Sequence, residues 1–547
     1  MKKTIGLILA FCVGEAAADA CTGLLAGKNA TTDGSVIITY AADSHTLYGE
    51  LYNQPAADHP AGAKRKIVEW DTGKYLGEID EVPHTFSTIG NMNEKGLCIT
   101  ESTWGGREGL VDSTGIVDYG SLIYIALQRA STAREAIKVM TDLVARYGYA
   151  SEGESFSIAD GDEAWVMEMI GKGKEKGAVW VAIRIPDDCI SGHANQSRIY
   201  KIPFKDKENC MYSKDVVSFA RKAGLFNGKD ADFEFSTAYS PSDFGTLRGC
   251  DARVWSYYNR FKAGMDAYLP FINGKKGAEK LPLYVKPDRK LNVRDVQNMM
   301  RDHFEGTPFD MTKDPGATAH FGVPYRYRPM SFKVDSVEYS QERAIATQQT
   351  GFVFVSQMRS SVPRELGCIW FGVDDANTAV FLPMYCCINS VPDSYRKGKA
   401  DLYTFDFDAA FWVNNLVANQ AYNRYSQMIP DIRKVQGGIE DKCATDQPSV
   451  ETRAKELLKS SRAEAVAYLT VYSVTTAQNA TKKYQDLAKY LFVKYLDGNR
   501  KKEKDGKFLR NEAGVPEYPD FPGYNQEYYD QIVRGSGDRL KVVQPEK

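Results

Sequence analysis

One cysteine of this chain, Cys21, stands where its own backbone could assist its chemistry. It follows Ala18-Asp19-Ala20, so cleavage after Ala20 makes it the first residue of the mature chain. A free α-amino group has a pKa of about 7.7 to 8.0 and is partly unprotonated near neutral pH. It can then act as the general base for the thiol of the same residue. The position therefore predicts a thiol nucleophile that needs no separate histidine.

Residues 1–20 have the layout of a secretory signal peptide. Two lysines precede an apolar run at 5–13, and small residues lead to an A-x-A cleavage site. The run is shorter than the about 20 residues that span a bilayer. We therefore predict an exported protein, periplasmic or secreted, that contacts no membrane once the signal is removed.

Lipidation of Cys21 is the alternative, because a cysteine directly after a signal sequence can carry a membrane anchor. A lipobox usually has Leu about three residues before the cysteine. This chain has Ala18 there, and Asp19 fits poorly beside it. The alternative predicts a lipid-anchored binding protein without catalysis.

The segment that starts at Cys21 resembles the start of the C69 family of dipeptidases. Further similar blocks follow in order along nearly all of the mature chain, at 93–97, 101–103, 163–168, 180–188, 193–196, 301–308 and 352–385. The family consists of N-terminal nucleophile hydrolases related to penicillin V acylase and bile salt hydrolase. The resemblance implies amide hydrolysis through an acyl-enzyme at Cys21.

The resemblance also implies which side chains assist Cys21. Asp43 matches an aspartate that orients the α-amine, Asn195 an asparagine of the oxyanion hole, and Arg253 an arginine near the active centre. A carboxylate beside the amine would tune the pKa of that amine, and a preorganised amide would stabilise negative charge on the carbonyl oxygen. The structural alternatives are a polar turn for Asp43, a glycosylation sequon for Asn195 and an ion pair for Arg253.

Tyr40 departs from the family pattern, which has an arginine at this position. A phenol donates a hydrogen bond but cannot replace a guanidinium charge, so the source of positive charge near the thiolate is left open. His45 could supply it, although an ordinary exposed histidine is the simpler interpretation. We predict that Tyr40, Glu101 and Trp104 line the substrate pocket, with packing or turn formation as the alternative for the last two.

The sequence contains no motif for a metal or a cofactor. HExxH, Walker, paired CxxC and GxGxxG patterns are absent, and the six histidines are scattered. We therefore predict that neither a cofactor nor a metal is used. Of the ten cysteines, eight remain without Cys12 and Cys21. An even number is compatible with disulfides in an exported protein, but Cys98 and Cys368 lie in apolar strands that favour buried free thiols.

Composition excludes some classes of protein. The chain has 547 residues and is 43% hydrophobic, which is enough for a large core, and its 69 Lys and Arg are matched by 71 Asp and Glu. Because no basic excess is present, nucleic acid is not an expected partner.

The pattern of apolar residues predicts an α+β fold. Residues 21–400 read as short strands with interspersed helices, and the resemblance refines this domain to the αββα four-layer sandwich of N-terminal nucleophile hydrolases. Over 409–428, 450–469 and 481–496 apolar residues recur at helical spacing. We expect residues 401–547 to form a helical extension packed on the same domain, ending in an extended tail.

Together these features favour an exported cysteine-type dipeptidase. The alternative enzyme keeps the mechanism and cleaves another small amide, such as an acyl amino acid or a bile-salt-like conjugate. The sequence leaves open whether the protein forms a homo-oligomer.

Overall fold

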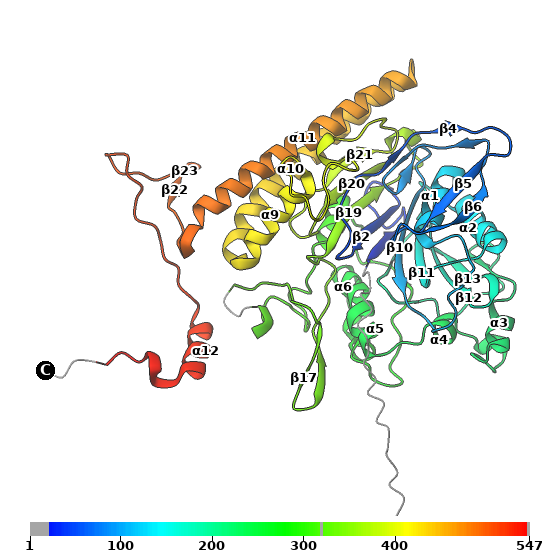
Figure 1. Ribbon diagram of the computed structural model, residues 1–547, viewed down its shortest axis with the longest axis horizontal. Coiled ribbons are helices and arrows are strands. Elements are labelled where there is room, and N and C mark those ends of the chain that lie inside the picture. Colours follow the sequence, from blue (N-terminus) through cyan, green and yellow to red (C-terminus); the bar gives the residue numbers. More distant parts are fainter. Residues whose placement is uncertain (1–20, 318–320, 544–547) are drawn as a thin grey trace, which may run out of the picture.

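Two antiparallel sheets face each other at the centre of the computed structural model, which describes residues 21–317 and 321–543 (Figure 1). The seven-stranded sheet has the order β16 (Tyr284–Val285), β14 (Ile190–His193), β1 (Gly23–Ala26), β2 (Ile37–Asp43), β19 (Thr350–Gln357), β20 (Cys368–Val373) and β21 (Leu382–Tyr385). The eight-stranded sheet has the order β15 (Cys210–Tyr212), β13 (Glu175–Ile185), β12 (Ala164–Lys172), β11 (Gly153–Ala159), β10 (Cys98–Trp104), β9 (Met92–Asn93), β8 (Thr88–Ile89) and β3 (Asn53–Gln54).

The eight-stranded sheet buries both of its faces. Along β12, Trp165 and Met167 belong to the core under the neighbouring helices, whereas Val166 and Ile170 belong to the core shared with the other sheet. Successive side chains of a strand point to opposite faces, so a strand covered on both sides must be apolar at almost every position.

Helices cover the two sheets. Helices α1 (Tyr119–Arg129) and α2 (Ala133–Tyr147) pack on the eight-stranded sheet. Helices α6 (Ala252–Phe261), α8 (Val293–Met299), α9 (Ala410–Asn423) and α11 (Arg462–Lys494) pack on the seven-stranded sheet (Figure 1). The predicted α+β class is confirmed. In the described part of the chain, none of the helices has the length and apolar composition to cross a membrane.

Shorter strands and helices lie outside the two central sheets and the helices that cover them. They are the two-stranded sheets β4 (Ala57–Asp58) with β7 (His84–Thr85), β5 (Lys64–Val68) with β6 (Tyr75–Asp80), and β17 (Ser331–Val334) with β18 (Val337–Ser340), and the helices α3 (Val216–Lys222), α4 (Phe235–Tyr239), α5 (Phe244–Thr246) and α7 (Leu269–Ile272). After α11 the chain leaves the body and forms β22 (Glu503–Lys504), β23 (Lys507–Phe508) and α12 (Gln526–Ser536) (Figure 1).

The helices after β21 have other bounds than the sequence pattern indicated. The stretch predicted as one helix over 409–428 is broken at Arg424, whose backbone is non-helical (φ −149°, ψ 52°). Helix α10 (Tyr425–Leu458) then continues through Pro430 and Pro448. A proline removes one backbone hydrogen bond, but α10 packs along α11. Tertiary packing therefore outweighs the local helix-breaking signal.

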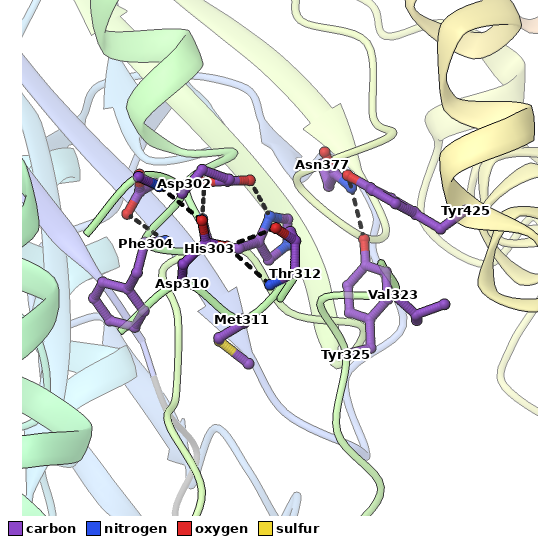
Figure 2. A network of polar contacts seen from close by, with 12 residues as sticks. Asp302, His303, Phe304, Asp310, Met311, Thr312, Val323, Tyr325, Asn377 and Tyr425 are labelled. Atoms are coloured by element: carbon purple, nitrogen blue, oxygen red, sulfur yellow. Dashed lines mark hydrogen bonds and ion pairs between the residues drawn. The ribbon is translucent and has the colours of Figure 1, made fainter. Parts of the chain in front are cut away.

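The segment between α8 and β19 has few regular elements and is held by buried polar contacts (Figure 2). The amide nitrogen of Asn377 donates to the hydroxyls of Tyr325 and Tyr425, each at 2.9 Å. The backbone N–H of Met311 donates to the carbonyl of His303 at 3.2 Å. These contacts tie the segment that precedes β19 to α10 and to the turn after β20.

Glu440 links α10 to the rest of the domain. Its carboxylate is almost fully buried, forms ion pairs with Arg294 and Arg301, and accepts a hydrogen bond from the backbone N–H of Phe381 at 2.9 Å. Arg301 is itself buried, so its charge depends on this partner.

Glu440→Ala should lower the free energy of unfolding by about 3–5 kcal/mol, because it leaves a buried guanidinium without its counter-charge. Asp441→Ala is the matched control, since Asp441 also pairs with Arg294 but its side chain is 77% exposed. The control should cost at most about 1 kcal/mol. Urea unfolding followed by circular dichroism measures both variants, and equal losses would contradict the assigned role of Glu440.

Candidate functional site

A pocket opens beside Cys21, where the two sheets and α1 meet. Its lining includes Cys21, two residues before β1, Asp43 at the end of β2, Glu101 of β10, and Tyr119 of α1. The strands thus bring together residues that are far apart in the sequence.

Backbone pairing fixes the chain directly after Cys21. Thr22 and Ala41 exchange two backbone hydrogen bonds, of 3.1 and 3.0 Å. Gly23 lies against the ring of His193, and a Cβ at this glycine would come within 2.6 Å of that ring. His193 is held between the hydroxyls of Ser102 and Ser157, each at 2.7 Å. Burial lowers the pKa of His193 to about 3, so a neutral imidazole supports the first strand.

The thiol of Cys21 lies in an anionic and nearly water-free environment. Its Sγ is 3.3 Å from Oε1 of Glu101 and 3.9 Å from the hydroxyl of Tyr40. Burial raises the pKa of the thiol well above its usual value, and the carboxylates of Glu101 and Asp43 raise it further. Without a nearby base or a positive charge, this thiol stays protonated at neutral pH.

Glu101 is one of two neighbouring buried carboxyl groups. Burial raises the pKa of Glu101 to about 7, although a hydrogen bond from the Tyr40 hydroxyl opposes the rise. Burial and the charge of Glu101 raise the pKa of Glu154 well above its usual range. Glu154 therefore keeps its proton at neutral pH, and Glu101 is the carboxyl group that ionises first.

Arg343 supplies positive charge that the sequence pattern did not locate. Its Nη2 lies 2.6 Å from Oδ2 of Asp43, whose other carboxylate oxygen accepts a hydrogen bond from Thr350, also at 2.6 Å. The side chain of His45, considered above for this role, is exposed. Arg343 is separated from Asp43 by 300 residues, so no local spacing could have identified it.

Arg253 contacts the backbone of Cys21. Its Nη1 donates to the carbonyl of Cys21 at 2.9 Å and to the hydroxyl of Thr22 at 2.8 Å. Its Nη2 donates to the carbonyl of Ala194 at 2.9 Å and to Oδ1 of Asn195 at 2.8 Å. Burial lowers the pKa of Arg253 to about 10, and the charge of Arg343 contributes. The guanidinium thus remains charged at neutral pH and connects Cys21 to Asn195.

Asn195 and Trp104 lie outside the lining of the Cys21 pocket. The amide nitrogen of Asn195 donates to the carbonyl of Thr103 at 2.7 Å, and the indole of Trp104 donates to the hydroxyl of Ser155 at 3.1 Å. Both residues border a separate surface depression. The pocket therefore unites four of the seven predicted site residues, Cys21, Tyr40, Asp43 and Glu101.

The pocket also has a lining that the sequence did not indicate. The hydroxyl of Tyr119 donates to Oδ1 of Asp71 at 2.8 Å, and Asn91 donates to the carbonyl of Ile99 at 3.0 Å. These residues belong to no motif, and only the meeting of α1 with the two sheets reveals them.

The remaining cysteines and potential metal ligands form neither a disulfide nor a metal-binding group in the described residues. All nine cysteines found there are free thiols, so the disulfides considered above are not formed. The same part of the chain contains no group of three His, Cys, Asp or Glu side chains arranged to hold a metal ion.

Comparisons with known proteins agree on one family. The model of Peptidase family C69 matches residues 20–438. A protein of Salmonella dublin named "Probable dipeptidase" is 29% identical over 403 residues, which cover 70% of this chain and 85% of the relative. A protein of the same name from Latilactobacillus sakei is 25% identical over 499 residues, 86% of this chain and 94% of the relative. A "Probable dipeptidase B" of Streptococcus pyogenes serotype M1 is 24% identical, covering 73% of this chain and 78% of the relative.

Glu101→Gln should make the stability of the protein less sensitive to pH. The folded-state pKa of about 7 lies above that of an unfolded glutamate. The folded state therefore binds more protons than the unfolded state between these values, and stability is lost as the pH rises through about 7. One such proton contributes up to about 1.4 kcal/mol per pH unit. Thermal unfolding from about pH 5 to about pH 8 measures this slope, and an unchanged slope in the variant would refute the raised pKa.

Proposed function

The chain belongs to peptidase family C69, and we propose that it is a dipeptidase whose nucleophile is Sγ of Cys21. The main support is the position of this thiol, which faces Glu101 in a pocket close to the start of β1. Arg253 fixes the carbonyl of the same residue. The names of the similar proteins from Salmonella dublin and Latilactobacillus sakei support dipeptides as the substrates.

In the proposed reaction the α-amine freed at Cys21 accepts the thiol proton. The sulfur attacks the carbonyl carbon of the peptide bond, and the C–N bond breaks as the resulting ammonium returns a proton to the leaving amine. A thioester joins the first amino acid to Sγ. Water then attacks the thioester with the same amine as base, which releases the amino acid and restores the thiol. The anionic surroundings of Cys21 support this scheme, because they make an unassisted thiolate unfavourable.

We assign supporting roles to the charged residues around the thiol. Asp43, paired with Arg343, would orient the α-amine. Arg253 holds the carbonyl of Cys21 and so the direction of its amine. The oxyanion role predicted for Asn195 stays a prediction, and through Arg253 this residue is suited to positioning Cys21.

We also propose that the fold is that of N-terminal nucleophile hydrolases and that the protein is exported. The facing sheets between helices and the place of Cys21 at the head of β1 support the fold assignment. The composition of residues 1–20 supports export, although this predicted signal lies outside the described residues. The burial of Cys21 disfavours the lipid-anchored alternative, because a lipidated sulfur could not occupy the same position.

Cys21→Ala should abolish hydrolysis of a dipeptide such as Ala-Ala, lowering kcat by about 1,000-fold or more. Cys443→Ala is the matched control, because it removes a buried thiol of α10 that lies away from the pocket. The control should keep its turnover, and both variants should unfold near the wild-type temperature. Release of alanine is measured by chromatography, and turnover by Cys21→Ala would place the nucleophile elsewhere.

One extra residue before Cys21 should also abolish turnover, because it converts the basic amine into an amide. Two proteins produced without residues 1–20, one starting at Cys21 and one carrying a single preceding glycine, provide the comparison. Intact mass verifies each amino terminus. Equal activity of the two proteins would show that the free α-amine is not required.

A further inference from the structure

The pocket beside Cys21 is acidic. Three of its lining residues carry carboxyl groups, Asp43, Asp71 and Glu101, whereas none of the described lining residues is a lysine or an arginine. A pocket of this composition attracts a cationic group and disfavours an anionic one.

Glu101 is the buried carboxylate of this lining that has no counter-charge among the described residues. Asp43 has its own guanidinium partner in Arg343, but Glu101 forms no ion pair with any described residue. Oε1 of Glu101 is contacted by two neutral groups, the hydroxyl of Tyr40 and the thiol of Cys21. The buried Oε2 has no partner among the described residues besides the neighbouring carboxyl group of Glu154. A buried carboxylate without a cation is costly, so a positively charged ligand group would be strongly favoured here.

The distances match the amino end of a peptide substrate. In a peptide with a free amino end, the α-nitrogen is two bonds from the first carbonyl carbon, or about 2.5 Å away. A carbonyl carbon poised for attack lies about 3–3.5 Å from the nucleophile. Because Oε1 of Glu101 lies 3.3 Å from Sγ, an α-ammonium beside the attacked carbonyl is within hydrogen-bonding reach of this carboxylate.

We infer that Glu101 binds the free α-ammonium group of the substrate and thereby restricts the enzyme to peptides with an unblocked amino end. This inference rests on the proposed role of Cys21 as the nucleophile. It separates the two substrate classes that the sequence left open. An acyl amino acid or a bile-salt-like conjugate has no ammonium beside its scissile carbonyl and would place an uncharged acyl chain against Glu101.

A matched series of small substrates tests the inference on the wild-type enzyme. Relative to Ala-Ala, N-acetyl-Ala-Ala lacks the charge of the amino end and Ala-Ala-amide lacks the charge of the carboxyl end. Acetylation removes the cation and should lower kcat/KM by about 10-fold to 100-fold, as expected for the loss of a charged hydrogen bond of about 1.5–3 kcal/mol. Amidation removes the anion and should leave kcat/KM within about threefold, because the lining offers no basic side chain to a carboxylate.

Glu101→Gln tests the residue itself, since it keeps the size of the side chain and removes its charge. The variant should lose most of the preference for Ala-Ala over N-acetyl-Ala-Ala. Glu154→Gln is the matched control, because a glutamine resembles the protonated carboxyl group already present there, and it should keep the preference. Circular dichroism verifies that both variants fold. If Glu101→Gln does not fold, the substrate series on the wild type still decides.

The possible failures are distinguishable. Equal kcat/KM for Ala-Ala and N-acetyl-Ala-Ala in the wild type, or an unchanged preference in Glu101→Gln, would overturn the inference and leave Cys21 as the nucleophile of a less selective enzyme. Hydrolysis of Ala-Ala by Cys21→Ala would instead overturn the proposed function.

Discussion

The burial of a thiol among carboxylates is the constraint on which the rest of the site depends. Glu101 and Asp43 both oppose ionisation of Cys21, and solvent is too scarce to offset them. A nucleophile in such a place needs its base immediately at hand, and an α-amine on the same residue meets this need without a further side chain. In the proposed mechanism the chemistry therefore depends on where the mature chain begins, so processing would be coupled to activity.

The fold must hold the charges around this thiol in fixed places. Arg253 and Arg343 come from different parts of the chain. Arg253 donates a hydrogen bond to the carbonyl of Cys21, and Arg343 forms an ion pair with Asp43. The segment that carries Arg343 has few regular elements, and buried contacts such as those of Asn377 with two tyrosines tie it to α10 (Figure 2). The C-terminal helices thus contribute to the site without touching it.

The same acidity that hinders the thiol gives the pocket a chemical preference. A carboxylate close to Sγ is a disadvantage for an isolated thiolate, but it suits a substrate that brings its own positive charge. In this proposal the carboxylate beside Sγ determines both how the thiol must be activated and which substrate end is bound. This relation is the basis of the proposed preference for a peptide with a free amino end over an acylated amino acid.

The sequence by itself determined the family, the α+β class and the candidate nucleophile, because these depend on patterns within short segments. The residues around Cys21 and the strand ending at Asp43 are of this kind. The partners of these residues were decided by tertiary structure: Arg343 pairs with Asp43 across 300 residues, and Glu101 reaches Sγ from the other sheet. The sequence also predicted Trp104 in the pocket and a helix over 409–428. In the structure Trp104 borders a separate depression, and α10 continues through Pro430 because it packs along α11. Such contacts depend on how the sheets and helices meet in space, which no single segment encodes.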